Sequence, residues 1–525
     1  MIDSFVKYVL GKIIVRGVKD DGTPTDLAMT NEGHAEMALH DPILPFGSVH
    51  AEGLTPIFQT DAVYGVNSGQ VSTTTGTGGT ATASDSSFLV TTGTSVGGQG
   101  IIQSRKRLRY RAGQGVVLRF AGGFTTPVAS SYQLLGCGHA EDGYYFGYQG
   151  TTFGILKVDR GGREVRTLTI TTASSTAENV TVTLNGTAFT VAVTNSANIQ
   201  RTVWEISQGT FTGWDAEPIG ATIRFVAKSA GAKSGAYSLS GTTAVGTFAQ
   251  TKAGAASTDT FVAQSSWNGD KLDGTGASGV TLDPTKGNVY QIGIQYLGSG
   301  CVTFKVLVTS TNTNNPIWTT VHTIKNPNTL TKTHIGNPAF PFTMAAYSAG
   351  STTDLTVRCG SFAGFVEGEK KLHGNRFTYF NTRTTVGATN LQAIFTIKNE
   401  RYYGGRTNQS VINLLAVMGA IKHTSPVIYY LVKNGSLAGN PSFASLASNS
   451  CSSWDTAATT VTYSTGDQLL WTGHVGDTGE IDHYFNGSGS EEITLQPGEW
   501  FTLAARATTG TPSFVTGSIN TREDQ

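Results

Sequence analysis

The sequence predicts a mainly β protein, in which a β-sandwich is interrupted by a small inserted α+β domain and followed by a C-terminal all-β sandwich domain. Charged residues make up only 14% of the chain, and Thr, Ser and Gly replace the Lys and Glu that helical proteins carry on their surfaces. This composition favours strands. Short alternating apolar segments, separated by turn signals at intervals of roughly ten residues, are typical of sandwiches.

Length and charge limit the classes of protein to which the chain can belong. Its 525 residues exceed the size of one hydrophobic core, so we expect about three or four domains. Lys plus Arg and Asp plus Glu number 36 each. The net charge is therefore zero, and no overall field steers the chain to nucleic acid or to an anionic membrane.

The cysteines and apolar segments indicate folding in a reducing cytoplasm. The four cysteines form no CxxC pair, which argues against a zinc site or a disulfide scaffold: Cys137, Cys301, Cys359 and Cys451. No apolar stretch reaches the roughly 18 residues of a membrane span. Asp3 and Lys7 interrupt the first apolar residues, so we expect no signal peptide.

Residues 1–50 are predicted to form an N-terminal arm or anchoring segment that docks onto a neighbour, or else an ordinary edge of the first domain. Residues 8–18 and 31–40 have strand-like patterns, and Asp-Gly and Pro within residues 19–24 predict a turn. Each proline of residues 41–47 keeps its predecessor extended.

Residues 51–166 are predicted to form the first part of the sandwich, centred on a hairpin that turns at Gln149-Gly150. Glycine supplies the positive φ that a two-residue hairpin loop needs. The predicted register pairs Tyr148 with Thr151, Phe146 with Phe153 and Tyr144 with Ile155, all on one apolar face. Gly147 and Gly154 on the other face indicate that a neighbour packs very close to it.

Two further segments of this part have distinctive compositions. Residues 72–98 are rich in Thr and Gly, and both strands and flexible linkers remain open. On a strand, the basic run would place four arginines on one face, opposite Leu108 and Tyr110: Arg105, Arg107, Arg109 and Arg111. We interpret that face as solvated or paired with carboxylates, and contact with an anion or acidic glycan is the alternative. The next strands are expected at residues 116–120 and 132–138.

Residues 167–256 change in pattern and are predicted to be the inserted domain. Asn185-Gly186 between two alternating segments is the strongest short-range hairpin signal. Ile199, Val203 and Ile206 recur at helical spacing before Gly209, which predicts a short amphipathic helix. Strands are expected at 222–227 and near 236–239. Insertion into a surface loop costs little, because loop-closure entropy grows slowly with length.

The sandwich is predicted to resume over residues 257–368, and residues 369–525 are predicted to form the C-terminal domain. Strands are expected at 289–297, 301–308, 318–324 and 355–365, and then at 393–398, 411–416, 427–432 and 500–505. Asn434-Gly435 predicts a hairpin, and Gln-Pro-Gly-Glu at residues 496–499 predicts a turn. The interrupted sandwich is expected to be of the jelly-roll or lectin-like kind.

Clustered polar residues give two candidates for a chemical site. His139, Glu141 and Asp142 could bind a metal ion or exchange protons. No nearby residue completes a ligand set, so we interpret them as ordinary residues before a hairpin. The second candidate is a set of aspartates that suit calcium: Asp270, Asp273 and Asp283. Their order matches no EF-hand, and Asp-Gly is common in turns.

The remaining signals favour structure over catalysis. The sequence has no GxSxG, HExxH or P-loop motif, although paired carboxylates for glycoside cleavage remain open because their pairing is spatial. The other candidates are interpreted as structural, with sugar stacking as the alternative for the aromatic ones: His334, His373, His483, Trp454, Trp471 and Tyr463. We therefore expect no enzyme, no catalytic or cofactor-binding residue, no cofactor and no metal.

A series of segments carries a resemblance to one group of proteins. The segments are residues 44–50, 55–65, the basic run with 110–115, 142–155, 180–193, 267–276, 289–298 and 521–524. Their order resembles virion structural proteins of tailed bacteriophages and of some large DNA viruses, over roughly residues 40–525. The resemblance implies exposure on a particle as a fibre, spike, baseplate or head decoration, and it implies no catalytic residues.

The expected function is that of a structural protein of a tailed phage virion, in a tail fibre, baseplate or adsorption apparatus that contributes to host attachment. A capsid decoration or head-fibre protein is the alternative, and a glycan-degrading tail spike is a further one. Expected partners are other virion proteins, further copies of the chain (a trimer is one option) and a host surface glycan or protein. Nucleic acid and membrane insertion are not expected. The expected location is the virion, after assembly in the host cytoplasm.

Overall fold

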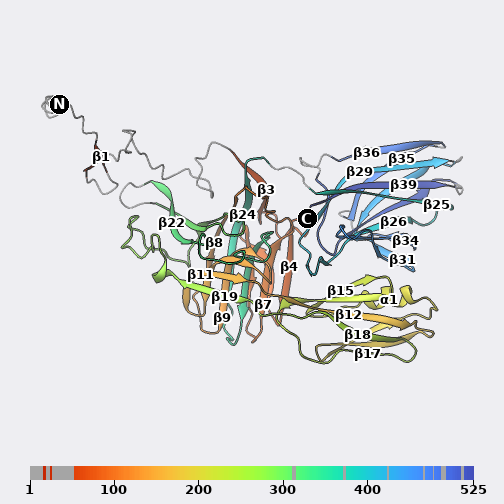
Figure 1. Cartoon of the computed structure of the whole chain (residues 1–525), viewed down its shortest axis with the longest axis horizontal. Coiled ribbons are helices and arrows are strands. Elements are labelled where there is room, and N and C mark those ends of the chain that lie inside the picture. The colour runs from red at the N-terminus through yellow and green to blue at the C-terminus, as the bar shows by residue number, and fades with distance from the viewer. Residues whose placement is uncertain are drawn as a thin grey trace. The chain divides into compact units, whose positions relative to one another are not determined.

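A computed structural model of the chain describes residues 16–18, 24–26, 53–309, 315–369, 374–422, 425–464, 468–476, 478–485, 492–509 and 514–524. The chain divides into two compact units (Figure 1). The first unit comprises Met1–Gly138, Gly143–Lys157 and Thr260–Glu369. The second unit comprises His139–Asp142, Val158–Asp259 and Lys370–Gln525, and so holds both the inserted and the C-terminal domain.

Little of the predicted N-terminal arm lies within the described residues. β1 (Arg16–Val18) pairs antiparallel with β2 (Pro24–Asp26). The expected strand at residues 31–40 and the extended segment at 41–47 lie outside the described ranges.

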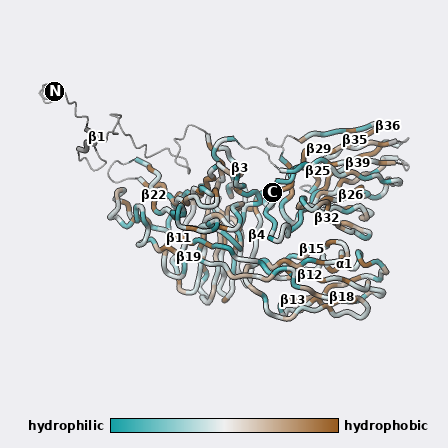
Figure 2. The backbone as a smooth tube through the Cα atoms, in the orientation of Figure 1, coloured by the Kyte–Doolittle hydropathy of each residue, from teal (hydrophilic) through white to brown (hydrophobic). Residues whose placement is uncertain are grey.

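The fold is mainly β, with several antiparallel sheets, as the sequence predicts. The helical elements that are described over their full length are α1 (Ile199–Ser207) and the short 3₁₀ helix η2 (Gln264–Ser266). Neither is long enough to cross a membrane. Apolar residues alternate with polar ones along the strands of both units (Figure 2), which is the pattern of strands with one buried face.

The first unit is a β-sandwich of two sheets. One sheet has the order β19 (Thr258–Ala263), β11 (Thr152–Asp159), β10 (Gly143–Gln149), β9 (Ser131–Gly138), β23 (Phe342–Ser348), β7 (Gln99–Ser104) and β4 (Val71–Gly76). The other has the order β22 (Pro316–Ile324), β21 (Val302–Thr309), β20 (Asn288–Ile294), β8 (Val116–Phe124), β24 (Thr356–Glu367), β6 (Ser87–Thr91) and β5 (Thr80–Ser84), and β3 (Leu54–Asp61) also pairs with β24. The Thr- and Gly-rich residues 72–98 therefore contribute strands.

Aromatic rings of the central hairpin form the middle of the sandwich core. The fully buried Phe146 ring on β10 lies 4.8 Å from Tyr290, 5.4 Å from Phe304 and 6.3 Å from Trp267, measured between centroids. Edge-to-face and tilted aromatic pairs at such distances add stabilisation beyond the buried area. The prediction that this hairpin has an apolar core face is confirmed.

The predicted hairpin loop is wrong by one residue. Gly150 and Thr151, rather than Gln149-Gly150, connect β10 to β11, and Gly150 has a φ of +59°. Gly150 does supply the positive φ, but at the first loop position. The Tyr148 ring consequently packs 5.1 Å from the Phe153 ring. The predicted close approach on the other face is present, because a Cβ on Gly154 would lie 2.3 Å from the Val262 carbonyl oxygen.

The basic run does not form the predicted strand. β7 ends at Ser104, whose hydroxyl donates to the Lys106 carbonyl at 2.6 Å and turns the chain there. In this described segment, Leu108 makes only an isolated bridge, to Phe340. Tyr110 packs edge-on against Tyr296, with centroids 4.8 Å apart. The arginines therefore do not share one strand face.

The inserted domain is α+β, and the chain leaves and re-enters the sandwich through the adjacent strands β11 and β19. Its four-stranded sheet has the order β15 (Trp214–Ile219), β16 (Thr222–Ala230), β12 (Arg163–Thr172) and β18 (Val245–Lys252). Its three-stranded sheet has the order β14 (Thr187–Val193), β13 (Glu178–Leu184) and β17 (Ser238–Ser240). Its own core includes Leu168, Val182, Ile206 and Phe225, which are essentially unexposed.

Two local predictions for the inserted domain are confirmed. Asn185 and Gly186 have φ values of +52° and +83° and join β13 to β14 in a two-residue hairpin. Asn198 caps α1, because its side chain accepts a hydrogen bond from the Arg201 backbone N–H at 3.0 Å. Val203 and Ile206 point into the domain core, as the helical spacing predicts.

The C-terminal domain consists of two main sheets. The five-stranded sheet has the order β25 (Asn375–Arg383), β39 (Val515–Asp524), β29 (Val411–Lys422) and β36 (Thr478–Tyr484), and β37 (Thr494–Leu495) also pairs with β29. The eight-stranded sheet has the order β31 (Ser436–Gly439), β34 (Ala458–Thr462), β26 (Gln392–Asn399), β38 (Trp500–Ala507), β30 (Val427–Lys433) and β35 (Leu469–Val475). In addition, β33 (Ser452–Asp455) pairs with β26, and β32 (Ala444–Ser445) pairs with β33. β27 (Tyr402–Tyr403) and β28 (Arg406–Thr407) form a small hairpin.

Asn434-Gly435 forms a turn but not the predicted hairpin. The strands that it joins, β30 and β31, are separated in the sheet by β34, β26 and β38. Asn434 has a φ of +53°, and its side-chain oxygen accepts a hydrogen bond from the Trp500 backbone N–H at 3.0 Å. The turn is thus fixed by β38 rather than by pairing of its own two strands.

Candidate functional site

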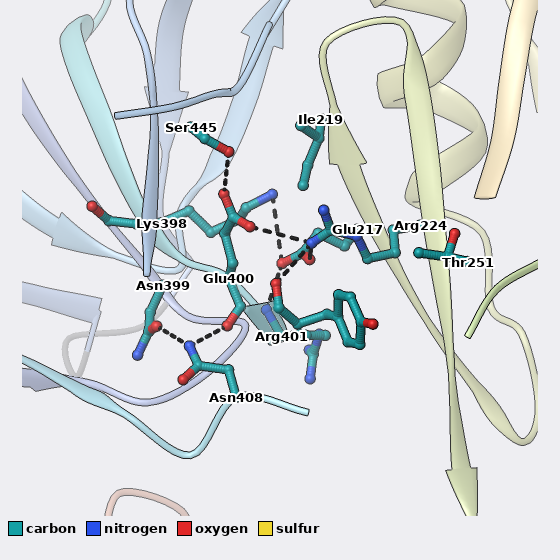
Figure 3. Close-up of polar contacts among 12 residues, drawn as sticks. Glu217, Ile219, Arg224, Thr251, Lys398, Asn399, Glu400, Arg401, Asn408 and Ser445 are labelled. Atoms are coloured by element: carbon teal, nitrogen blue, oxygen red, sulfur yellow. Dashed lines mark hydrogen bonds and ion pairs between the residues drawn. The ribbon is translucent and has the colours of Figure 1, made fainter. Parts of the chain in front are cut away.

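A cluster of charged side chains lies between the inserted and the C-terminal domain of the second unit (Figure 3). This charged cluster consists of Glu217, Arg224, Lys398, Glu400 and Arg401. Glu217 on β15 and Arg224 on β16 are cross-strand partners. Lys398 lies near the end of β26, and Glu400 and Arg401 follow that strand.

Arg224 joins carboxylates from both domains. Its Nη1 donates to Glu217 Oε2 at 3.1 Å and to Glu400 Oε2 at 3.2 Å. The same nitrogen donates to the Tyr402 carbonyl at 2.9 Å, and the guanidinium lies 5.3 Å from the centroid of the Tyr402 ring. One cation of the inserted domain therefore bridges a carboxylate of its own domain and one of the C-terminal domain.

Lys398 connects the same two domains from the other side, because it belongs to the C-terminal domain and contacts the inserted domain. Its Nζ donates to the Pro218 carbonyl at 2.8 Å and lies 3.8 Å from Glu217 Oε1. It also lies 4.4 Å from the centroid of the Phe443 ring. A cation of the C-terminal domain thus reaches into the inserted domain, and its charge is balanced there.

The remaining acceptor sites of the two carboxylates are also occupied. The Arg401 backbone N–H donates to Glu217 Oε1 at 2.8 Å, and the Ser445 hydroxyl donates to Glu400 Oε1 at 2.8 Å. The Arg401 guanidinium lies 3.6 Å from Asp215 Oδ2. Every carboxylate oxygen of the cluster therefore has a partner, which a buried carboxylate requires.

Burial shifts the proton affinities within the charged cluster. The exposed fractions of the Glu217, Lys398 and Glu400 side chains are 1%, 4% and 5%. Burial raises the pKa of Glu400, the negative charge of Glu217 adds to this shift, and Arg224 opposes it. Burial lowers the pKa of Lys398, and both carboxylates oppose this shift.

A cavity of about 130 Å³ adjoins the charged cluster. Among the residues that line it are Trp204, Phe443, Trp500, Glu217, Lys398 and Arg401. The Trp204 ring on α1 stacks on the Phe443 ring, with centroids 6.2 Å apart. The aromatic contact and the ionic contacts therefore bring together the same two domains.

This geometry suits a cluster that holds the two domains together better than it suits a reaction centre. Glycoside cleavage by two carboxylates requires both of them at the substrate, and Glu217 lines the cavity whereas Glu400 does not. The cavity is also smaller than the roughly 300–1,000 Å³ of common ligand pockets. Buried charges that satisfy one another make separation of their domains costly, because separation would leave each charge without its partner.

The structure brings the predicted residues His139, Glu141 and Asp142 together, and each of them accepts a hydrogen bond from a backbone N–H group. Glu141 Oε1 accepts from the Arg163 backbone N–H at 3.1 Å and from the Thr407 hydroxyl at 3.2 Å. Asp142 Oδ1 accepts from the Arg160 backbone N–H at 3.0 Å, and His139 Nδ1 accepts from the Glu141 N–H at 3.2 Å.

The three aspartates of the possible calcium loop each bind the backbone of their own loop. Asp270 accepts from the N–H groups of Leu272 and Ser278, Asp273 from that of Thr275, and Asp283 from that of Thr285, at 2.8–3.0 Å. In the part of the chain that the structure describes, no three His, Cys, Asp or Glu side chains gather as a group that could hold a metal ion.

Among the described single histidines and aromatic candidates, His483 and Trp471 lie together, with ring centroids 5.9 Å apart. His334 is buried, and its Nδ1 is 2.7 Å from the Tyr144 hydroxyl. The His483 ring contacts Trp471 and Phe485, Trp454 packs near Tyr379, and Tyr463 is 38% exposed. His373 lies outside the described residues. The four cysteines are free thiols.

Sequence reasoning missed the charged cluster. One signal was present: the apolar strand Ala393–Ile397 is followed at once by Lys398, Asn399, Glu400 and Arg401. A charged run at the end of a buried strand must find partners or lie in solvent. The partners, however, are in the inserted domain, and nothing local identifies them.

No protein-family model matches the chain, and no curated protein matches its sequence. Among solved structures, the chain is similar to a legume lectin-like domain from Entamoeba histolytica, at 8% identity and a TM-score of 0.23, over 56% of this chain and 89% of that one. It is also similar to the Faustovirus major capsid protein, at 7% identity and a TM-score of 0.10, over 86% and 89%. Likenesses at such TM-scores carry no argument about function.

Proposed function

We propose that the protein is a structural component of a tailed phage particle, in a tail fibre, baseplate or adsorption apparatus, and that it contributes to host attachment without catalysing a reaction. The observation that carries the proposal is the charged cluster, whose buried charges are used to hold two domains together. A protein that transmits load between particle and host needs such fixed domain junctions. The sequence resemblance to virion structural proteins supports the same assignment.

The surface chemistry of the sandwich supports a binding role. A hollow of about 450 Å³ in the first unit is lined by Thr125, Thr126, Thr353, Asp354 and Arg358, among others. Loop residues on a fixed scaffold commonly carry recognition. Hydroxyl-rich surfaces of this kind make weak contacts individually, and a homo-oligomer, such as a trimer, would multiply them. The other partners in this proposal are neighbouring virion proteins and a host surface glycan or protein.

Gold-labelled antibody against the protein, viewed on intact particles by electron microscopy, tests the proposal. We expect the label at the tail end. Label over the whole head would replace the proposal with the head-decoration alternative, in which the protein is present in hundreds rather than tens of copies. Absence of label from every particle would contradict a virion role. A polysaccharide digestion assay with the purified chain, expected to show no cleavage, separates attachment from the tail-spike alternative.

A further inference from the structure

The solvent-facing side of the five-stranded sheet in the C-terminal domain carries a groove of about 250 Å³. Its lining consists of Met418, Gly419, Ala420, Glu480, Ile481, Asp482, Thr516 and Ser518. Successive residues of β39 point to opposite faces of the sheet, and Gly517 and Ile519 are buried whereas Thr516 and Ser518 are partly exposed. The groove, which Thr516 and Ser518 line, therefore lies on the face that points away from the core.

The strand register places the groove between two exposed aromatic rings. One row across the four strands runs Phe380, Ser518, Met418, Asp482, and the next runs Thr382, Thr516, Ala420, Glu480. Phe380 is 64% exposed on β25, and Tyr484 is 65% exposed on β36. Three strand spacings of about 4.8 Å separate those strands, so the rings flank a surface about 14 Å wide.

The floor of the groove is fixed from below. Tyr429, a buried residue of the other sheet, donates through its hydroxyl to the carbonyls of Ala420 and Thr516, both at 2.9 Å. Its ring packs on Gly419, where a Cβ would lie 2.5 Å from the ring. A surface whose backbone is held in this way loses little conformational freedom when it binds.

Two of the four polar side chains that line the groove are carboxylates that the fold does not use. Glu480 and Asp482 are exposed, and neither forms an ion pair or hydrogen bond with another side chain in the described part of the chain. Carboxylates only accept hydrogen bonds, whereas the Ser518 and Thr516 hydroxyls both donate and accept. The complementary ligand therefore presents several donors and carries apolar faces for Phe380 and Tyr484.

A sugar has this combination of hydroxyl donors and C–H faces, and a second copy of the chain does not. A two-fold contact through the groove would set Glu480 and Asp482 of one copy against the same carboxylates of the other, and like charges across an interface are costly. Stable protein interfaces are also depleted of charge at their centres. An acidic glycan would be repelled by the same carboxylates. The hollow of the first unit is the weaker candidate, because no exposed aromatic side chain lines it.

We propose that the groove binds a neutral oligosaccharide, with sugar hydroxyls donating to Glu480 and Asp482 and with Phe380 and Tyr484 packing on the sugar rings. This inference deepens the proposed role in host attachment and rests on it for the origin of the glycan. The chemistry of the groove itself is independent of where on a particle the protein lies.

Binding of the purified full chain to a printed panel of neutral, amino and acidic oligosaccharides tests the inference, followed by calorimetry with the neutral sugar that binds best. We expect neutral sugars to bind. The double variant Glu480→Gln with Asp482→Asn, and separately Tyr484→Ala, should each weaken that binding about tenfold or more. The matched controls are Asp259→Asn, an exposed carboxylate elsewhere, and Tyr64→Ala, a fully exposed tyrosine, and both should bind as the unchanged chain does.

Three results would overturn the inference. They are binding of acidic sugars alone, unchanged neutral-sugar binding by the double variant, and self-association in sedimentation that the double variant abolishes in the absence of sugar. No binding to any sugar of the panel would also count against it. The position of the gold label on the particle does not depend on any of these results. A failure of this inference is therefore distinguishable from a failure of the proposed attachment role.

Discussion

The charged cluster and the groove both depend on glutamate and aspartate side chains of the second unit, but these side chains have different surroundings. Glu217 and Glu400 are almost completely buried, and all their oxygens accept hydrogen bonds or face cations of the protein. Glu480 and Asp482 are exposed, and neither carboxylate bonds to another side chain among the residues that the structure describes.

This difference separates charge that holds the fold from charge that is available to a ligand. A buried carboxylate with every acceptor site filled cannot gain from a new partner without losing an old one. An exposed carboxylate on a rigid backbone can gain a new partner without losing one. Neutralising the carboxylates of the charged cluster should therefore lower the free energy of unfolding, whereas neutralising those of the groove should lower the affinity for a ligand.

The largest effect is expected from Lys398→Ala. The substitution removes a buried cation that faces Glu217, so the free energy of unfolding of the second unit should fall by about 3–5 kcal/mol. Urea denaturation followed by tryptophan fluorescence measures it. The control is Lys286→Ala, at a lysine that is 79% exposed and paired with Asp283, where the expected change is below about 1 kcal/mol. If both variants lost the same free energy of unfolding, the charged cluster would not be what holds the two domains together.

A smaller effect is expected at the floor of the groove. In Gly419→Ala the new methyl group would lie 2.5 Å from the Tyr429 ring, and this overpacking should cost about 1–3 kcal/mol of unfolding free energy. The same denaturation assay reports it. Gly287→Ala is the control, because no atom lies within 4 Å of the position of its Cβ. If Gly419→Ala were as stable as this control, the backbone at the floor of the groove would be less rigid than the hydrogen bonds of Tyr429 imply.

Glu178 is an intermediate case, since it is only partly buried but well satisfied. The Thr243 hydroxyl and the backbone N–H of Ala244 donate to it, and these bonds lower its pKa from 4.5 to about 2. Glu178→Gln should cost about 1 kcal/mol at neutral pH.

The pH dependence of that loss has a definite sign. Because the folded-state pKa lies below the ordinary value, the stability that Glu178 contributes is present above pH 4.5 and is lost as the pH falls from 4.5 toward 2. Unfolding of the variant and of the unchanged chain, compared at pH 7 and pH 3, should show a smaller difference at pH 3. An equal difference at both pH values would assign the effect to packing instead.

The smallest effect on stability is expected in the groove itself. Glu480→Gln with Asp482→Asn should change the free energy of unfolding by no more than about 0.5 kcal/mol, because exposed side chains without partners contribute little. A loss above about 1 kcal/mol in the urea assay would show that these carboxylates serve the fold, and would remove the contrast with the charged cluster.

The sequence was informative wherever a short segment determines its own geometry. Asn185-Gly186 forms its hairpin because both residues tolerate positive φ and alternating strands flank them. The helix near Val203 follows from apolar spacing alone. The hairpin and the helix within residues 167–256 were therefore predictable, as was the mainly β class of the chain.

Where the outcome depends on distant partners, local patterns were insufficient. Asn434-Gly435 has the composition of a hairpin, yet β38 rather than its own strands fixes it. Lys398 donates to Pro218 across 180 residues of sequence, and no spacing rule links the two positions. The groove is likewise a product of strand order, since β25, β39, β29 and β36 come from separated parts of the C-terminal domain.

The placement of the inserted domain also determines the order in which a ribosome can complete the protein. β8 pairs with β20 and β24, which are synthesised only after Val158–Asp259. At about 5–20 residues per second, that interval takes about 5–20 s. Throughout it, Tyr144 and Phe146 of the nascent chain lack Tyr290 and Phe304, which later pack against them from β20 and β21 of the opposite sheet. The core residues of the inserted domain, in contrast, all lie within the interval itself. Chaperones that shield apolar strands should therefore act on the half-made sandwich, and their supply should limit the yield of soluble protein.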